Sequence, residues 1–256
     1  MMSPAAAGER FLKRNRSPFA DHLRKEASGL EALRHAAAGS GIEVPEVLRV
    51  DEQWLELTRI RAVAASPAQW ERLGRGLAAI HAVRQPRFGF PEDNYIGLNP
   101  QRNTPGEDWG RFFLEQRLAF QVALVRDAQR QREYRATLDR QAKRLVAFLG
   151  AQDIAPALLH GDLWSGNVLF DANGSVWLID PAVYWGDPEA DIAMTEMFGG
   201  FAPQFLAAYR AQHPPSVSYE RKRGIYNLYH ALNHLHLFGD SYLDACEAGW
   251  AGIEAL

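Results

Sequence analysis

Apolar residues in the first sixty positions recur with two different spacings, and each spacing predicts a different element. Within residues 17–35 they recur at intervals of three and four, which predicts a helix with one buried face. Three short apolar runs instead predict strands, with a turn at Asp51-Glu52 between the last two. The helix positions are Leu23, Ala27, Leu30 and Leu33, and the strand runs are residues 9–15, 44–50 and 54–60.

After residue 66 the spacing becomes mainly helical. Residues 67–81 predict a helix with Ser66 as its N-cap and a proline at its first position. Residues 109–132 and 134–149 predict two more helices. The intervening residues 88–107 are rich in Pro, Gly and Asn and predict a long loop. Loops of more than about 12 residues inside a compact domain are often functional, so this loop is a candidate for the substrate side of a site.

Two further apolar runs, residues 168–170 and 176–179, flank the sequence Asp171-Ala172-Asn173-Gly174, whose composition is typical of a hairpin turn. The chain is helical in character again from residue 189 to the end. The sequence therefore predicts an α+β fold. It has a small β-containing N-terminal part and a larger, mainly helical C-terminal part that carries the hairpin.

Composition narrows the classes of function. Of 256 residues, 47% are hydrophobic and 23% charged, and the formal net charge is -3 without any basic run, so neither nucleic acid nor an anionic membrane is expected as a partner. Cys246 is the only cysteine, which excludes an internal disulfide and favours a reducing compartment; we expect it to be a small buried residue. No apolar run approaches the roughly 20 residues that span a bilayer, and no secretory signal is evident. A cytoplasmic protein is expected.

The segment LLHGDLWSGNVLF, residues 158–170, holds the strongest chemical signal. Asp162 precedes Asn167 by five positions, and Asp180 lies thirteen positions further on, at the far end of the predicted hairpin. Because a hairpin brings its outer ends together, Asn167 and Asp180 should converge and offer oxygens to a hard cation such as Mg²⁺. Asp162 could then orient an attacking hydroxyl and accept its proton. Together with His160 this is the spacing of a kinase catalytic loop followed by a metal-binding Asp.

A kinase also needs a lysine for the nucleotide phosphates and a carboxylate that holds this lysine. Lys13 in the first predicted strand and Glu26 on the following helix suit these roles. The alternative is an ordinary surface pair, since Lys25 lies next to Glu26. Glu56 and Leu57 lie in the strand that leads into the helical part, where a two-lobed kinase supplies backbone groups to adenine.

With these residues identified, the chain resembles the fructosamine kinase (ketosamine-3-kinase) family, a branch of the protein-kinase-like fold close to aminoglycoside phosphotransferases. The resemblance runs from about Glu9 to the C-terminus. The Leu163-Trp164-Ser165 filling of the loop and the continuation Asp180-Pro181-Ala182 point to the ketosamine branch. Its most specific stretches are HGDLWSGN (160–167), IDPAVYWGDPEADIAMTEMFGGF (179–201), FGFPEDNYIGLNPQ (88–101), DWGRFFLEQRL (108–118) and YHALNHLHLFG (229–239).

The resemblance implies two lobes, a partial N-lobe at residues 1–60 and a helical C-lobe with the acceptor site at residues 61–256. It implies ATP and Mg²⁺ as cofactors, and phosphorylation of the sugar 3-hydroxyl of a ketosamine, either a small molecule or a glycated protein amine. By position, Asp162 is the catalytic residue, Asn167 and Asp180 are the metal ligands, and Lys13 with Glu26 holds the phosphates. It also implies that Asp191 braces the catalytic loop; the alternative is a carboxylate at a helix N-terminus.

The substrate side is less determined by the sequence. Trp164 inside the catalytic loop offers a flat ring to a sugar or a cationic amine, with core packing as the alternative. Trp185 and His234 are further candidates. His230 and His234 share a helix face, but no third ligand accompanies them, which favours packing or hydrogen bonding over metal binding.

One feature departs from the family pattern. The family carries a glycine-rich turn over the nucleotide phosphates, whereas only twelve residues, with Gly8 as their one glycine, precede Lys13. We therefore expect an exposed edge on the strand of Lys13, weak ATP binding and low turnover. Two other functions stay open: a kinase of another hydroxylated small molecule such as an aminoglycoside, and a catalytically weak binding protein that keeps the acceptor site.

Overall fold

A three-stranded antiparallel sheet forms the N-terminal part of the computed structural model, which describes residues 9–151 and 154–256. The strand order is β1-β3-β2, with β1 at Arg10–Arg14, β2 at Val47–Val50 and β3 at Trp54–Thr58. In this register Lys13 lies opposite Leu55. Among the described residues β1 is an edge strand, as expected, and Phe11 and Leu12 on it are exposed. The expected absence of a glycine-rich turn concerns residues 1–8, which lie outside the described residues.

Helix α1 (His22–Ala36) packs on this sheet through the predicted apolar face, and Leu23, Leu30 and Leu33 are buried. It begins five residues later than the spacing predicts. The amide of Asn15 donates to the carbonyl of Phe19, and the backbone of Ser17 donates to Asn15, so these residues form a turn instead of helix.

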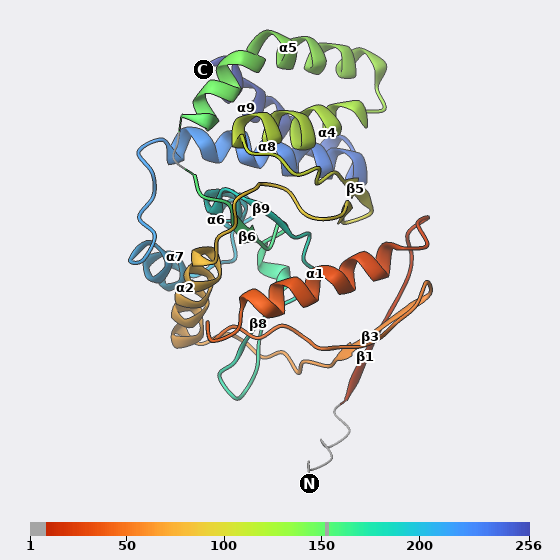
Figure 1. Ribbon diagram of the computed structural model, residues 1–256, viewed down its shortest axis with the longest axis vertical. Coiled ribbons are helices and arrows are strands. Elements are labelled where there is room, and N and C mark those ends of the chain that lie inside the picture. The colour runs from red at the N-terminus through yellow and green to blue at the C-terminus, as the bar shows by residue number, and fades with distance from the viewer. Residues whose placement is uncertain (1–8, 152–153) are drawn as a thin grey trace.

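The expected long loop 88–107 contains a small hairpin that the sequence did not predict. Strands β4 (Asn94–Ile96) and β5 (Asn99–Gln101) pair across a turn at Gly97, which has a φ of 58°. Runs of three residues are too short to show alternation in a sequence. The hairpin lies against α1 on one side and the helical part on the other (Figure 1).

Helix α2 (Pro67–Ala82) starts as predicted, because Ser66 and Gln69 form a capping box. The next helices divide at a different place than predicted. A run of α3 (Trp109–Phe112), a π-helical segment (Phe113–Ala119) and α4 (Phe120–Ala123) is followed by α5 (Ala128–Gly150). The break falls before residue 128 and not at 133, since Asp127 caps the backbone N–H of Arg130.

The predicted hairpin after Asn167 forms from β7 (Val168–Phe170) and β8 (Val176–Leu178). A second pair, β6 and β9, lies beside it, and helices complete the chain. Their bounds are β6 Ala157–Leu159, β9 Tyr184–Gly186, α6 Pro188–Met197, α7 Pro203–Arg210, α8 Tyr219–Phe238 and α9 Leu243–Glu254, with 3-10 turns at Ser165–Asn167 and Asp240–Tyr242.

Figure 1 shows α4, α5, α8 and α9 gathered at one end of the molecule, and β1, β3 and α1 at the other, which agrees with the predicted α+β arrangement. Two apolar clusters make the core. One joins α3, α5, α8 and α9, and the other joins α1 and β3 to α2, α7 and the β7–β8 hairpin. The division between residues 60 and 61 stays a prediction. None of the helices described here combines the length and apolar composition that a membrane crossing needs.

Candidate active site

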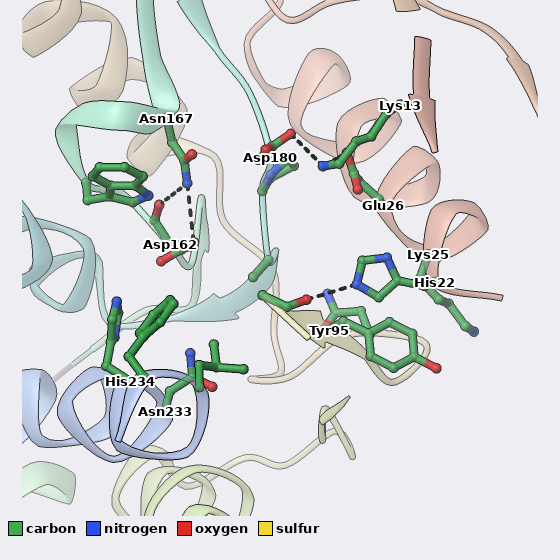
Figure 2. Close-up of a pocket in the computed structure, with 17 residues that line it drawn as sticks. Lys13, His22, Lys25, Glu26, Tyr95, Asp162, Asn167, Asp180, Asn233 and His234 are labelled. Atoms are coloured by element: carbon green, nitrogen blue, oxygen red, sulfur yellow. Dashed lines mark hydrogen bonds and ion pairs between the residues drawn. The ribbon is translucent and has the colours of Figure 1, made fainter. Parts of the chain in front are cut away.

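A cavity of about 280 Å³ lies between the N-terminal sheet, α1 and the segment 162–182. Side chains from five separate parts of the chain point into it (Figure 2). They come from β1, α1, the β4–β5 hairpin, the segment 162–182 and the end of α8. The residues predicted for phosphate transfer that line this cavity are Lys13, Glu26, Asp162, Asn167 and Asp180.

Asp162 and Asn167 are held together by the short 3-10 turn between them. The side-chain nitrogen of Asn167 donates to the backbone carbonyl of Asp162 at 2.8 Å and to its carboxylate at 3.3 Å. This orientation leaves the amide oxygen of Asn167 as its acceptor atom. Burial raises the pKa of Asp162 to about 7, although the bond from Asn167 opposes the shift. A carboxyl with such a pKa is suited to accept a proton near neutral pH.

Asp180 follows the hairpin at the point where its outer ends meet. The backbone N–H of Ile179 donates to the carbonyl of Asn167 at 3.1 Å, which closes the hairpin as the sequence predicts. Asp180 itself has a φ of 51°, the only described non-glycine residue in the left-handed region. That conformation costs on the order of 1 kcal/mol and persists only when its surroundings impose it.

Lys13 connects this carboxylate to α1. Its ammonium lies 2.8 Å from Glu26 and 3.0 Å from Asp180. Burial alone would lower the pKa of Lys13, but the two carboxylates outweigh burial and raise it. Lys13 is therefore charged at neutral pH and suited to bind phosphate oxygens. The alternative, an ordinary surface pair between Glu26 and Lys25, does not form, because Lys25 pairs with Glu92.

The oxygens of Asn167 and Asp180 fit a magnesium ion bound together with nucleotide phosphates. Mg²⁺ prefers oxygen ligands and is usually held by one or two carboxylates, with phosphates and water completing the shell. In the part of the chain that the structure describes, no group of three or more His, Cys, Asp and Glu side chains forms an all-protein metal site. The donor set thus suits a metal that arrives with the nucleotide.

A buried carboxylate behind the site holds the catalytic segment by its backbone. Asp191 accepts from the backbone N–H of His160 at 2.7 Å and of Gly161 at 2.9 Å. Gly161 has a φ of 81° and approaches the carbonyl of Ala182, where any side chain would clash. His160 donates from Nε2 to the carbonyl of Ile179, so it joins the two ends of the site. Asp191 also stands in the first turn of α6, so both sequence interpretations describe its position.

His81 is a functional-site neighbour that the sequence did not reveal. It is fully buried on α2, and its ring bridges Asp191 at 3.3 Å and the hydroxyl of Tyr209 at 2.9 Å. Although burial alone would raise it, the pKa of Asp191 is lowered, chiefly by the bond to His81. A single histidine on an apolar helix face gives no signal of this partnership.

Replacing Asp191 by Ala should destabilise the protein by about 3 kcal/mol, because two buried N–H groups and His81 lose their acceptor. Urea unfolding followed by circular dichroism measures this loss. The matched control is Asp139→Ala on the exposed face of α5, which should change stability by less than about 0.5 kcal/mol. Equal stability of the two variants would contradict the bracing role.

The substrate-side candidates separate into two groups. Trp164 and His234 line the cavity, whereas Trp185 in β9 does not. Glu56 and Leu57, predicted for the adenine side, lie in the central strand β3 and are also outside the lining of this cavity. The ring of Trp164 lies over Gly166, where a Cβ atom would come within 2.1 Å of it. His234 donates from Nδ1 to the carbonyl of His230 at 2.7 Å, which leaves Nε2 as an acceptor. The ring of His234 is therefore hydrogen-bonded, whereas the ring of His230 is buried with its Nδ1 unpartnered in the described part of the chain.

Comparison with known proteins decides the family. The sequence profile described as fructosamine kinase matches residues 2–250. The chain belongs to the fructosamine kinase family. It is 39% identical over 237 residues to a Synechocystis protein described as "Probable ketoamine kinase", with 91% of this chain and 78% of the relative covered. It is 37% identical over 243 residues to a chloroplastic protein-ribulosamine 3-kinase of Arabidopsis thaliana, covering 92% of this chain and 73% of the relative.

Solved structures agree with the fructosamine kinase fold. A candidate fructosamine-3-kinase from Thermobifida fusca superposes with a TM-score of 0.80 at 29% identity, over 96% of this chain and 86% of the other. The choline kinase LicA of Streptococcus pneumoniae superposes with a TM-score of 0.64 at 15% identity, over 99% and 89% of the two chains. This second likeness shows the protein-kinase-like fold alone.

Proposed function

We propose that this protein transfers the γ-phosphoryl group of ATP to the sugar 3-hydroxyl of a ketosamine of the fructosamine or ribulosamine type. The observation that carries the proposal is the meeting of Asp162, Asn167, Asp180 and the Lys13–Glu26 pair at one cavity in a member of the fructosamine kinase family. An activity of this kind repairs glycation, because the 3-phosphate makes the adduct unstable and the amine is released.

Each residue at the cavity has a definite task in this transfer. Asp162 orients the acceptor hydroxyl and takes up its proton as the oxygen forms its bond to the γ-phosphorus; the bond to the bridging oxygen breaks and ADP leaves. Lys13 binds phosphate oxygens, and Glu26 fixes the direction of its ammonium. Asn167 and Asp180 would hold Mg²⁺, which, when bound, neutralises phosphate charge. Trp164 and His234 would contact the sugar or its amine substituent.

Substrate profiling tests the proposal. Purified protein with ATP and Mg²⁺ should phosphorylate ribulosamine or fructosamine conjugates, free or on protein, and leave aminoglycosides unmodified. Transfer requires that the acceptor hydroxyl reach Asp162 in the cavity. Mass spectrometry of each acceptor measures an added phosphoryl group, and parent protein without acceptor gives the background hydrolysis. Transfer to aminoglycosides alone would support the alternative that the protein is a kinase of another hydroxylated small molecule. Binding of ketosamines without any transfer would show the catalytically weak binding protein.

A further inference from the structure

Three side-chain amides, from the β4–β5 hairpin and the loop just after it, form a buried network at the wall of the cavity, which Asn94 itself lines. Asn94, Gln101 and Asn103 are each 5% exposed or less. Gln101 donates from Nε2 to the side-chain oxygen of Asn94 at 2.8 Å, and Asn103 donates to the same oxygen at 2.8 Å. The oxygen of Gln101 accepts from the hydroxyl of Tyr229 at 2.6 Å. A buried network whose members are satisfied in this way is rigid and fixes one geometry.

Two donors of this network end on the backbone just after Asp180. Gln101 donates to the carbonyl of Ala182 at 2.9 Å, and Asn94 donates to the carbonyl of Val183 at 2.9 Å. The backbone N–H of Ala182 also donates to His160. The segment is therefore held on both sides of the peptide chain. This is the kind of support that a left-handed residue such as Asp180 requires.

A fully buried arginine anchors the network from the helical part. Arg117, in the π-helical segment, donates to the side-chain oxygen of Asn103 at 2.9 Å and to the carbonyl of Arg102. Its guanidinium lies 3.9 Å from the ring centroid of Tyr184, and no carboxylate pairs with it in the described part of the chain. This buried charge is held by rings, by the loop oxygens of Arg102 and Asn103 and by the carbonyl of Gln116 in its own helical segment, so it ties the position of the hairpin to the core.

The same hairpin also carries the wall of the cavity and contacts α1. Tyr95 lines the cavity (Figure 2), as does Gly97. The hydroxyl of Tyr95 donates to Asp21, the residue before α1, at 2.6 Å. Lys25 directly precedes Glu26 on α1, and its ammonium lies 2.6 Å from Glu92, just before the hairpin. The hairpin thus lies between the acceptor side of the cavity, the metal-side carboxylate and the helix of Glu26.

We propose that Gln101 and Asn94 are positioning residues for Asp180: their side-chain amides hold the segment 180–183 so that the carboxylate faces the metal and the nucleotide phosphates. The hairpin then links the acceptor wall to the metal site. This inference rests on the proposed function only in taking Asp180 as a metal ligand. Residues that orient a metal ligand without touching the metal change its affinity by about 10- to 100-fold when they are replaced.

The test compares two buried glutamines that make the same kind of bond. Gln101→Met removes the donors to Ala182 and Asn94. Gln69→Met is the matched control, because Gln69 is 6% exposed and donates to the carbonyls of Asp171 and Ser175, away from the cavity. Both variants lose buried hydrogen bonds, so both should unfold at lower urea concentration. A purely structural role would show in that loss alone.

The decisive measurement is Mn²⁺ binding in the presence of a non-hydrolysable ATP analogue, followed by electron paramagnetic resonance. Gln101→Met should bind Mn²⁺ about tenfold more weakly than the parent, and Gln69→Met should bind as the parent does. Equal affinity in the two variants would overturn the proposal. If Gln101→Met does not fold, Gln101→Glu, which keeps the acceptor for Tyr229 and removes the donor, replaces it.

A measurement on the unchanged protein makes the inference independent of any variant. In ¹⁵N-labelled protein the side-chain amide resonance of Gln101 should shift when Mg²⁺ and the ATP analogue bind, and that of Gln69 should not. No shift at Gln101 on saturation would contradict the coupling. If the parent binds Mn²⁺ with the analogue but phosphorylates no ketosamine, the proposed substrate fails and the positioning role stands. If the parent binds no Mn²⁺, both fail.

Discussion

Asp162→Asn is expected to lower turnover by about three orders of magnitude, while the affinity for Mg²⁺ and nucleotide stays near that of the parent. The amide keeps the size of the side chain and can still accept the bond from Asn167, but it cannot take up the proton of the hydroxyl. Steady-state kinetics with a ketosamine acceptor and calorimetric titration with the ATP analogue measure the two quantities. Asp139→Asn on exposed α5 is the matched control. Near-parental turnover of Asp162→Asn would refute the role of Asp162 as base.

The same variant should also be more stable than the parent above neutral pH. Burial raises the pKa of Asp162 to about 7, so its ionisation opposes folding. Below the ordinary pKa of an aspartate the group is protonated in the folded and the unfolded protein, and its contribution to stability is fully present. That contribution is lost as the pH rises through the folded-state pKa of about 7. Asn does not ionise, so at pH 8 the variant should gain up to about 4 kcal/mol, and at pH 4 the two proteins should unfold alike. If Asp162→Asn were less stable than the parent at pH 8, ionisation of buried Asp162 would not oppose folding, and the prediction would be wrong.

Asp180→Asn is expected to reduce the affinity for nucleotide in the presence of Mg²⁺ by about 100-fold and to leave nucleotide binding without metal little changed. The substitution removes the charge that the metal requires, and Asn tolerates the left-handed conformation of this position. Asp180→Ala should show the same loss of metal-dependent binding together with lower stability, because Ala is strained at a φ of 51°.

The comparison of these two variants separates charge from backbone. Titration calorimetry with and without Mg²⁺ measures how far nucleotide affinity depends on the metal. Thermal unfolding measures the stability lost through backbone strain at position 180. Unchanged metal dependence in Asp180→Asn would show that Asp180 is not a ligand. Asp139→Asn, on the exposed face of α5 and outside the cavity lining, serves as the control for the loss of a carboxylate.

Local signals in the sequence predicted the elements that carry their own determinants. Ser66 and Gln69 mark the start of α2, and the turn composition after Phe170 marks the β7–β8 hairpin. That hairpin fixed the meeting of Asn167 and Asp180, because register follows from a short turn. Lys13 and Glu26 were also paired correctly, since a strand and the following helix pack locally.

Interactions between segments that are distant along the chain could not be predicted from the sequence. The partnership of His81 with Asp191 joins two helices, and the bonds of Gln101 to Ala182 join a three-residue strand to a loop eighty positions away. Neither an isolated buried His nor an isolated Gln differs in sequence from a surface residue. The same limit explains why Glu56 and Leu57 could be placed only by position, and why Trp185 could not be separated from Trp164.

The backbone of the catalytic hairpin is also paired with the N-terminal part. Glu43 accepts from the N–H of Leu178 and donates to the carbonyl of Val176, and Val63 donates to Phe170. Together with the apolar cluster shared by α1, β3 and this hairpin, these bonds make the nucleotide side and the catalytic side one cooperative folding unit. Loss of order at Lys13 would therefore spread to Asp162, so a partly unfolded molecule would lose both sides of the proposed site together.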